Sequence, residues 1–128
     1  MKSFILSLFF VLGSLTTMAS GEQESFYPSH CSNFGDEVSY SFTSCVNSNF
    51  RSLGYELPRV FLSHCSNYGP DLSYNFESCV SRNFRNIERE LGMFLSLCFN
   101  SGGGVSYSFI SCINRNMNDI SYELRRQQ

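Results

Sequence analysis

Three stretches of the chain carry apolar residues at intervals of three or four positions. The middle stretch has them at Leu72, Phe76, Cys79, Val80, Phe84, Ile87 and Leu91. The first and last stretches repeat the pattern over residues 38–57 and 105–124. At about 100° per residue these positions fall on one face of a helix. The pattern therefore predicts three amphipathic helices of about twenty residues each.

Turn residues flank each predicted helix. The segments 35–37 (Gly-Asp-Glu) and 69–71 (Gly-Pro-Asp) predict starts, because proline fits a first turn and acids favour a helix N-terminus. Pro58 and Gly92 predict the first two ends. A short apolar arm, such as residues 60–62 or 93–95, precedes each helix and ends in a cysteine and an Asn-x-Gly turn. Both a helical turn and an extended conformation remain open for this arm.

The six cysteines divide the chain into three similar units. Each pair is fourteen residues apart, and successive pairs begin 34 and 33 residues apart. Ser-His-Cys-Ser-Asn-Phe-Gly at 29–35 becomes Ser-His-Cys-Ser-Asn-Tyr-Gly at 63–69 and Ser-Leu-Cys-Phe-Asn-Ser-Gly at 96–102. Such self-similarity indicates an internal repeat. We place the three units at about 26–58, 59–92 and 93–124.

Equal spacing within the units favours one disulfide in each. Six cysteines allow fifteen pairings, and the simplest for three equal units is Cys31–Cys45, Cys65–Cys79 and Cys98–Cys112. Each bond, closing a loop of about fifteen residues, should contribute about 3 kcal/mol. The closely spaced cysteine pairs of a zinc site are absent from the sequence, so we expect no metal.

The N-terminus resembles a secretory signal. Lys2 precedes a short apolar run, and small residues around Ala19 suit cleavage there. Gly13 and the following hydroxyl residues interrupt the run too early for a membrane anchor. Residues 1–19 are therefore predicted to be a signal peptide, and residues 20–128 a single secreted, extracellular domain.

Composition and charge exclude several classes of protein. The chain is 42% hydrophobic and 16% aromatic, which excludes disorder as its main state. Without Lys2, eight arginines face eleven acidic residues, a net charge of −3. Nucleic-acid binding requires clustered positive charge, and lytic membrane peptides require a basic face. We expect no nucleic-acid partner and no stable membrane insertion.

Recurrent polar residues lie on the apolar face of each predicted helix. These are the asparagines Asn49, Asn83 and Asn116, followed by Glu56, Glu90 and Glu123. The favoured interpretation is that the amides bond one another or the backbone of an arm and fix register. The alternative is a polar pocket in which the amides and carboxylates bind a ligand or cation.

A tyrosine recurs opposite the apolar face of each helix, at Tyr40, Tyr74 and Tyr107. We favour a second buried surface there, because the middle helix of a stack contacts neighbours on two sides. The alternative is an exposed aromatic ladder that binds a partner.

No catalytic set is recognisable in the sequence. His30 and His64 precede the first cysteine of two units, but no acidic partner lies near them to complete a metal site. No Gly-x-Ser-x-Gly segment is present, and all six cysteines are assigned to bonds. We therefore predict neither an enzyme nor a cofactor.

These observations predict an all-α fold. Three disulfide-stapled units of arm plus helix pack as a closed small bundle, which we favour, or as a short stack. The leading functional hypothesis is a secreted, non-enzymatic binding or effector protein of the venom, reproductive or defence type, with an extracellular protein as partner. The alternative is an extracellular carrier of a lipid or small apolar ligand.

Overall fold

Three α-helices form the framework of residues 25–128, the part of the chain that the computed structural model describes. They are α1 (Tyr40–Glu56), α2 (Tyr74–Leu91) and α3 (Tyr107–Arg126). Residues 25–128 contain no β-strand, so the predicted all-α class is confirmed for them. The predicted signal peptide lies outside the described residues.

A serine begins each helix. Its hydroxyl oxygen accepts the backbone N–H three residues later, so one unpaired helical donor is satisfied. The pairs are Ser39 with Phe42, Ser73 with Phe76, and Ser106 with Phe109. The predicted starts at 35–37 and 69–71 are wrong, because those segments form bends that precede the serine cap.

The predicted helix ends agree with the structure. Pro58 follows closely after the end of α1 at Glu56, with Leu57 in the C-cap position. Gly92 closes α2 in the left-handed conformation, with φ 65°, and donates its N–H to the carbonyl of Glu88. Helix α3 continues to Arg126, two residues before the C-terminus.

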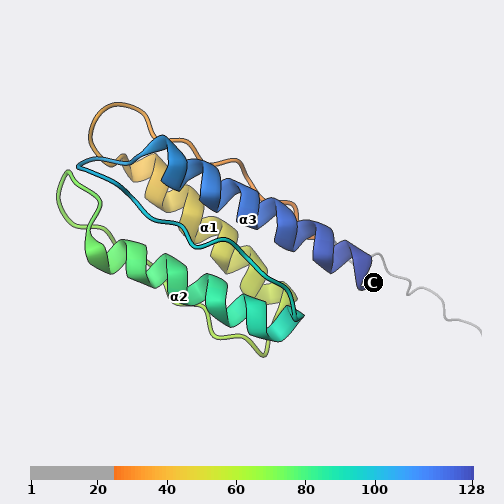
Figure 1. Cartoon of the computed structure of the whole chain (residues 1–128). Helices are drawn as coiled ribbons and strands as arrows, with labels where there is room; N and C mark the ends of the chain where they lie inside the picture. The colour runs from red at the N-terminus through yellow and green to blue at the C-terminus, as the bar shows by residue number, and fades with distance from the viewer. Residues whose placement is uncertain (1–24) are drawn as a thin grey trace, which may run out of the picture.

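All three helices run in the same direction, and non-helical arms return along the bundle between them (Figure 1). We call residues 25–34, 57–68 and 92–101 the first, second and third arms. They contain no helical residue, which decides the question that the sequence left open. Because each arm carries the chain back to the starting end, consecutive helices lie parallel.

The core consists of the apolar faces of the helices. Phe42, Phe76 and Phe109 are fully buried. The rings of Phe42 and Phe76 lie 6.3 Å apart, and those of Phe50 and Phe84 lie 5.3 Å apart in an edge-on arrangement. Burying each such side chain stabilises the fold by about 1.5–3 kcal/mol, so the helices are held mainly by these inward faces.

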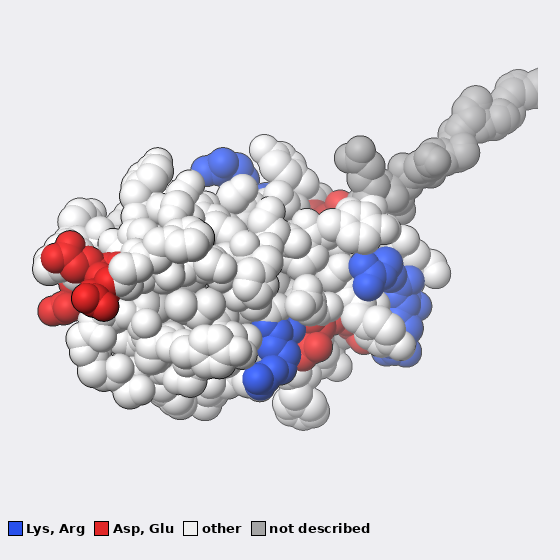
Figure 2. Space-filling view, turned by 90° about the horizontal axis from the view of Figure 1, so that it is seen from above, with Lys and Arg blue, Asp and Glu red and all other residues white. Residues whose placement is uncertain are grey.

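Acidic side chains gather at one end of the bundle, whereas the other end carries both arginines and glutamates (Figure 2). The loops before α1 and α2 carry Asp36, Glu37 and Asp71, next to the helix N-termini. Arg125 and Arg126 end α3 at the other end. Acidic residues offset the positive end of a helix dipole, and Arg125 and Arg126 offset the negative end of α3.

Candidate functional site

Three disulfides join each arm to the helix that follows it. They are Cys31–Cys45, Cys65–Cys79 and Cys98–Cys112, the pairing that the spacing favours, with Cα–Cα distances of 5.5–5.6 Å. The arm cysteine is buried in every case. Each bond therefore fixes one arm against its own helix.

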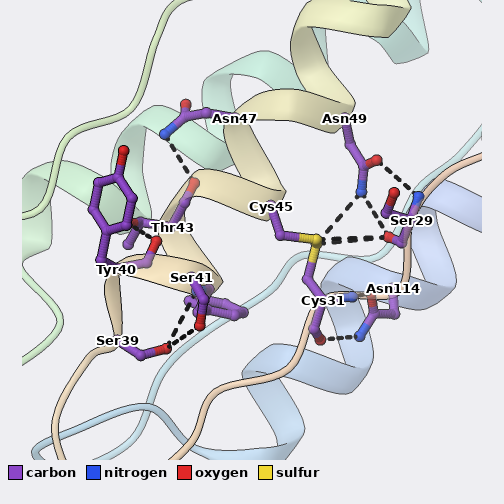
Figure 3. The surroundings of a disulfide bond; sticks show 11 residues. Ser29, Cys31, Ser39, Tyr40, Ser41, Thr43, Cys45, Asn47, Asn49 and Asn114 are labelled. Atoms are coloured by element: carbon purple, nitrogen blue, oxygen red, sulfur yellow. Dashed lines mark hydrogen bonds between the residues drawn. A yellow bond between two sulfur atoms is a disulfide. The ribbon is translucent and has the colours of Figure 1, made fainter.

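Asn49, Asn83 and Asn116 bind the backbone of the arms. Each amide oxygen accepts the N–H of an arm serine and each amide NH2 donates to the carbonyl of the same serine, over 2.8–3.0 Å. The serines are Ser29, Ser63 and Ser96. Figure 3 shows this pair of bonds from Asn49 beside the first disulfide. The side chains are buried and satisfied, and each serves its own arm rather than a shared pocket.

Two further asparagines join a helix to an arm other than the one that precedes it. Asn47 of α1 makes the same two bonds to the backbone of Cys65, at 2.7 and 2.6 Å. Asn114 of α3 makes them to Cys31, at 2.9 and 2.8 Å, so the last helix holds the first arm (Figure 3). Neither residue was predicted from the sequence as part of a site. Their recurrence two positions after the second cysteine was the available signal.

A third set of asparagines shapes the loops before the helices. The amide oxygen of Asn33 accepts the N–H of the cap residue Ser39 at 2.7 Å, and its NH2 donates to the carbonyls of Gly35 and Glu37. Asn67 and Asn100 make the corresponding contacts in their loops. This network explains why the helix begins at the serine.

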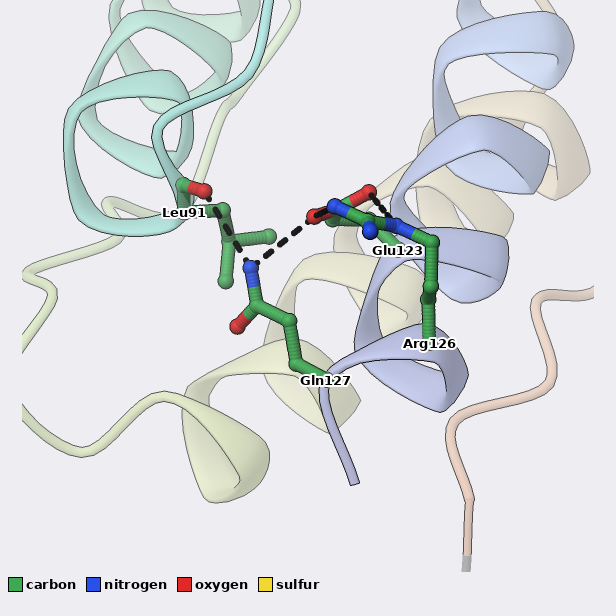
Figure 4. Close-up of polar contacts among 4 residues, drawn as sticks. All are labelled: Leu91, Glu123, Arg126 and Gln127. Atoms are coloured by element: carbon green, nitrogen blue, oxygen red, sulfur yellow. Dashed lines mark hydrogen bonds and ion pairs between the residues drawn. The ribbon is translucent and has the colours of Figure 1, made fainter.

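The recurrent glutamates do not meet. Glu90 faces Arg59 at 3.7 Å, whereas Glu123 binds Arg126 at 2.7 Å (Figure 4). Hydrogen bonds from Arg126 and Gln127 hold the pKa of Glu123 below its usual value. Over residues 25–128, no group of three or more His, Cys, Asp or Glu side chains is placed to hold a metal ion.

The recurrent tyrosines face solvent. Tyr40, Tyr74 and Tyr107 are 79–84% exposed, so the favoured prediction of a second buried surface is wrong. The reason is geometric: each helix packs inward and is flanked by arms, which leaves its outer face without a neighbour.

Many aromatic side chains are exposed on the outer surface. All seven tyrosines are exposed, and so are Phe34, Phe61, Phe94 and Phe99. Isolated exposed apolar residues are common, but aromatic residues are enriched where proteins bind partners. This surface is therefore the feature from which a function is best argued.

Four of these exposed residues line a groove between α1 and the second arm, which we call the α1 groove; they are Tyr40, Tyr55, Phe61 and Tyr68. It consists of two adjoining hollows of about 390 and 370 Å³. Both hollows are lined by Asn47, Arg51 and His64. The aromatic lining residues are Tyr40 and Tyr68 in one hollow, and Phe50, Tyr55 and Phe61 in the other.

The charge of the α1 groove differs from that of the whole chain. Arg51 is its only permanently charged lining residue, and no Asp or Glu occurs among the described residues that line its two hollows. The chain as a whole carries a formal charge of −2. The groove therefore favours anionic groups although the protein is acidic.

No similarity to known proteins gives evidence on the function of this chain. Comparison of the chain with protein-family models, with curated proteins and with solved structures gives no match. Among the described residues, no helix combines the length and the apolar character that crossing a membrane requires.

Proposed function

We propose that this chain is a secreted, non-enzymatic protein that acts outside the cell by binding a protein partner. Three disulfides are typical of oxidising compartments. The signal-like residues 1–19 agree with this setting. On this proposal residues 20–128 are the mature domain.

The exposed aromatic surface carries the proposal. The interior is already filled by aliphatic side chains and by phenylalanines such as Phe42, Phe76 and Phe109, which are fully buried. The exposed rings are therefore additional to what folding uses. Tyrosine and phenylalanine contribute large contact area at low conformational cost, and they are enriched at binding surfaces.

The disulfides and asparagine contacts support binding by fixing the surface in place. Each arm is joined to its own helix by a disulfide and an amide pair. A surface ordered before binding loses less entropy when a partner docks.

We further infer that residues 26–58, 59–92 and 93–124 are three copies of one unit, closed into a bundle. The contact of Asn114 with Cys31 supports closure, because a linear stack would separate its last helix from its first arm.

The same packing gives less support to a lipid or small apolar ligand carrier. A carrier encloses its ligand in an apolar cavity. Here the hollows between α1 and the second arm open at the surface, and their lining includes Arg51 and His64.

Affinity capture tests the proposed function. The folded mature protein is immobilised, and extracellular fluid from its source is passed over it beside a reduced and alkylated control. We expect a protein to be retained by the folded form and not by the control. Equal retention on both, or none on the folded form, would contradict the proposal. A small apolar mass that leaves on denaturation in native mass spectrometry would instead favour the carrier role.

A further inference from the structure

Gly54 lies inside α1, where glycine is unfavourable. A helical glycine is less stable than alanine by about 1 kcal/mol. The backbone here is ordinary helix, and a Cβ added at Gly54 would meet no atom within 4 Å. Neither the backbone nor the packing of this chain therefore requires glycine. Gly54 does line the α1 groove, where the missing side chain leaves open space.

The corresponding positions in the other two helices carry side chains that join helix to arm. Glu88 of α2 accepts the N–H of Leu95 in the third arm through Oε1 at 2.8 Å. Ser121 of α3 donates its hydroxyl to the carbonyl of Phe26 in the first arm at 2.7 Å. Asn47 joins α1 to the second arm at Cys65, but among the described residues α1 has no bridging side chain at the position of Gly54. The groove is thus open where its counterparts are bridged.

This opening leaves a backbone donor free. Leu62 occupies the position of Leu95, and its N–H has no acceptor among residues 25–128. The first arm avoids the same problem, because Pro28 at this position has no N–H. Leu62 lines the same hollow as Gly54 and Arg51. The hollow therefore offers a free N–H and a guanidinium, with no carboxylate of its own.

The length of the groove indicates the kind of ligand. It extends along α1 from Tyr40 to Tyr55, and fifteen residues of helix span about 22 Å. An extended peptide of six or seven residues covers this length at about 3.3 Å per residue. Such a length exceeds that of a single small carboxylic acid.

We propose that the α1 groove binds an extended acidic peptide segment of the extracellular partner. Its carboxylate lies over Gly54, between the Arg51 guanidinium and the Leu62 N–H. Flanking apolar side chains pack against Tyr55 and Phe61. The inference rests on the proposed binding function and adds the chemistry of the ligand and its site.

Synthetic peptides test the ligand chemistry. The probes are fluorescein-labelled heptapeptides with a central glutamate and varied apolar neighbours, each paired with its glutamine counterpart. Fluorescence anisotropy with the folded protein is expected to give at least tenfold tighter binding for the best glutamate peptides. Equal binding of the glutamate and glutamine members would overturn the proposal.

Variants test the location. Gly54→Gln is expected to fill the opening, to leave the melting temperature unchanged or raised, and to weaken the best peptide at least tenfold. Arg51→Gln is expected to weaken it at least fivefold. Arg85→Gln, the corresponding position of α2, is the matched control and should leave binding unchanged. An unaffected Gly54→Gln variant, or equal losses in the two arginine variants, would place the ligand elsewhere.

Two outcomes separate this inference from the proposed function. If a captured extracellular protein still binds the Gly54→Gln variant, the binding function stands and the groove assignment fails. If neither peptide nor extracellular protein is retained, both proposals fail. Sedimentation that gives a wild-type dimer and a monomeric Gly54→Gln variant would assign the groove to self-association and overturn the peptide proposal.

Discussion

At the scale of single residues, the asparagine amide is the most important polar group in this molecule. An extended arm residue presents one N–H and one C=O, and a carboxamide offers one acceptor and one donor that match them. Asn83 satisfies both groups of Ser63 while being only 1% exposed. A buried backbone pair without such a partner is strongly unfavourable.

Replacing Asn83 with alanine should therefore destabilise the fold. Two hydrogen bonds are lost and the backbone groups of Ser63 are left unpaired, so we expect a loss of about 2–4 kcal/mol in the free energy of unfolding. Urea denaturation followed by circular dichroism measures it. Asn86→Ala is the control, because Asn86 makes a single, more exposed bond to Phe61. Similar losses in the two variants would argue against the structural role of Asn83.

Gly104 provides a second prediction at this scale. It is buried, has a φ of 66°, and a Cβ there would clash with the carbonyl oxygen of Asp36. Gly102 also has a positive φ, of 80°, but a Cβ there would meet nothing within 4 Å. Gly104→Ala should lower the melting temperature clearly more than Gly102→Ala, since only the former adds a clash to backbone strain. Equal shifts would mean that the loop moves freely to relieve the contact.

Glu123 gives a prediction about pH. Its carboxylate accepts bonds from Arg126 and Gln127, which lower its pKa from the ordinary 4.5. A lowered folded-state pKa contributes stability above the unfolded value, and this is lost as the pH falls through the folded value. Glu123→Gln should melt below wild type at pH 6, and the difference should shrink as the pH falls below about 4.5. A difference that grows towards acid pH would contradict this sign.

At the scale of helices and arms, the features that could be predicted from the sequence are the three helices and the three disulfides. The apolar period placed the three helices, and the constant cysteine interval favoured the observed disulfides. The sequence did not predict where the helices begin. Ser39 caps α1 by accepting the N–H of Phe42, and Asn33 holds the backbone of Ser39 in place by accepting its N–H. That contact depends on the folded path of the chain.

The candidate site was less predictable than the helices. Tyr40 was expected in a second core because its outward position recurs, yet recurrence alone does not distinguish a covered face from a solvent-facing one. The α1 groove joins residues of α1 to the second arm, and the arm's conformation was undecided. The role of Gly54 could not be inferred from the sequence, because it depends on the bonds that Glu88 and Ser121 make to the arms at the corresponding positions.

Ser81 marks a missing contact between α2 and the third arm. At the corresponding positions of α1 and α3, Asn47 and Asn114 bond to the backbone of an arm cysteine. Within residues 25–128, the Ser81 side chain makes no such bond to Cys98. Ser81→Asn should supply this amide pair and raise the free energy of unfolding by about 1 kcal/mol. Chemical denaturation checks it, with Ser78→Asn on the same helix as the control. A gain in both variants would point to a general effect of asparagine rather than to the new pair.

At the scale of the whole molecule, the beginning and end of the described chain lie at the same end of the bundle (Figure 1). The Arg125 guanidinium lies 5.5 Å from the centre of the Tyr27 ring. Ser121 of α3 bonds to Phe26 at the start of the first arm. The two termini of the domain are therefore close neighbours, held by the same contacts that join a helix to an arm elsewhere.

Because the contacts of Phe26 and Tyr27 with α3 keep the two ends of the described chain close together, this fold should accept a different starting point. A circular permutant that links Gln128 to Ser25 through a short Gly-Ser spacer, and opens at the exposed turn between Pro58 and Arg59, breaks no helix and no disulfide. We expect it to form the same three bonds on non-reducing peptide mapping and to melt within a few degrees of the unpermuted domain. The order in which the three helices are synthesised would then not be a requirement of the folded protein.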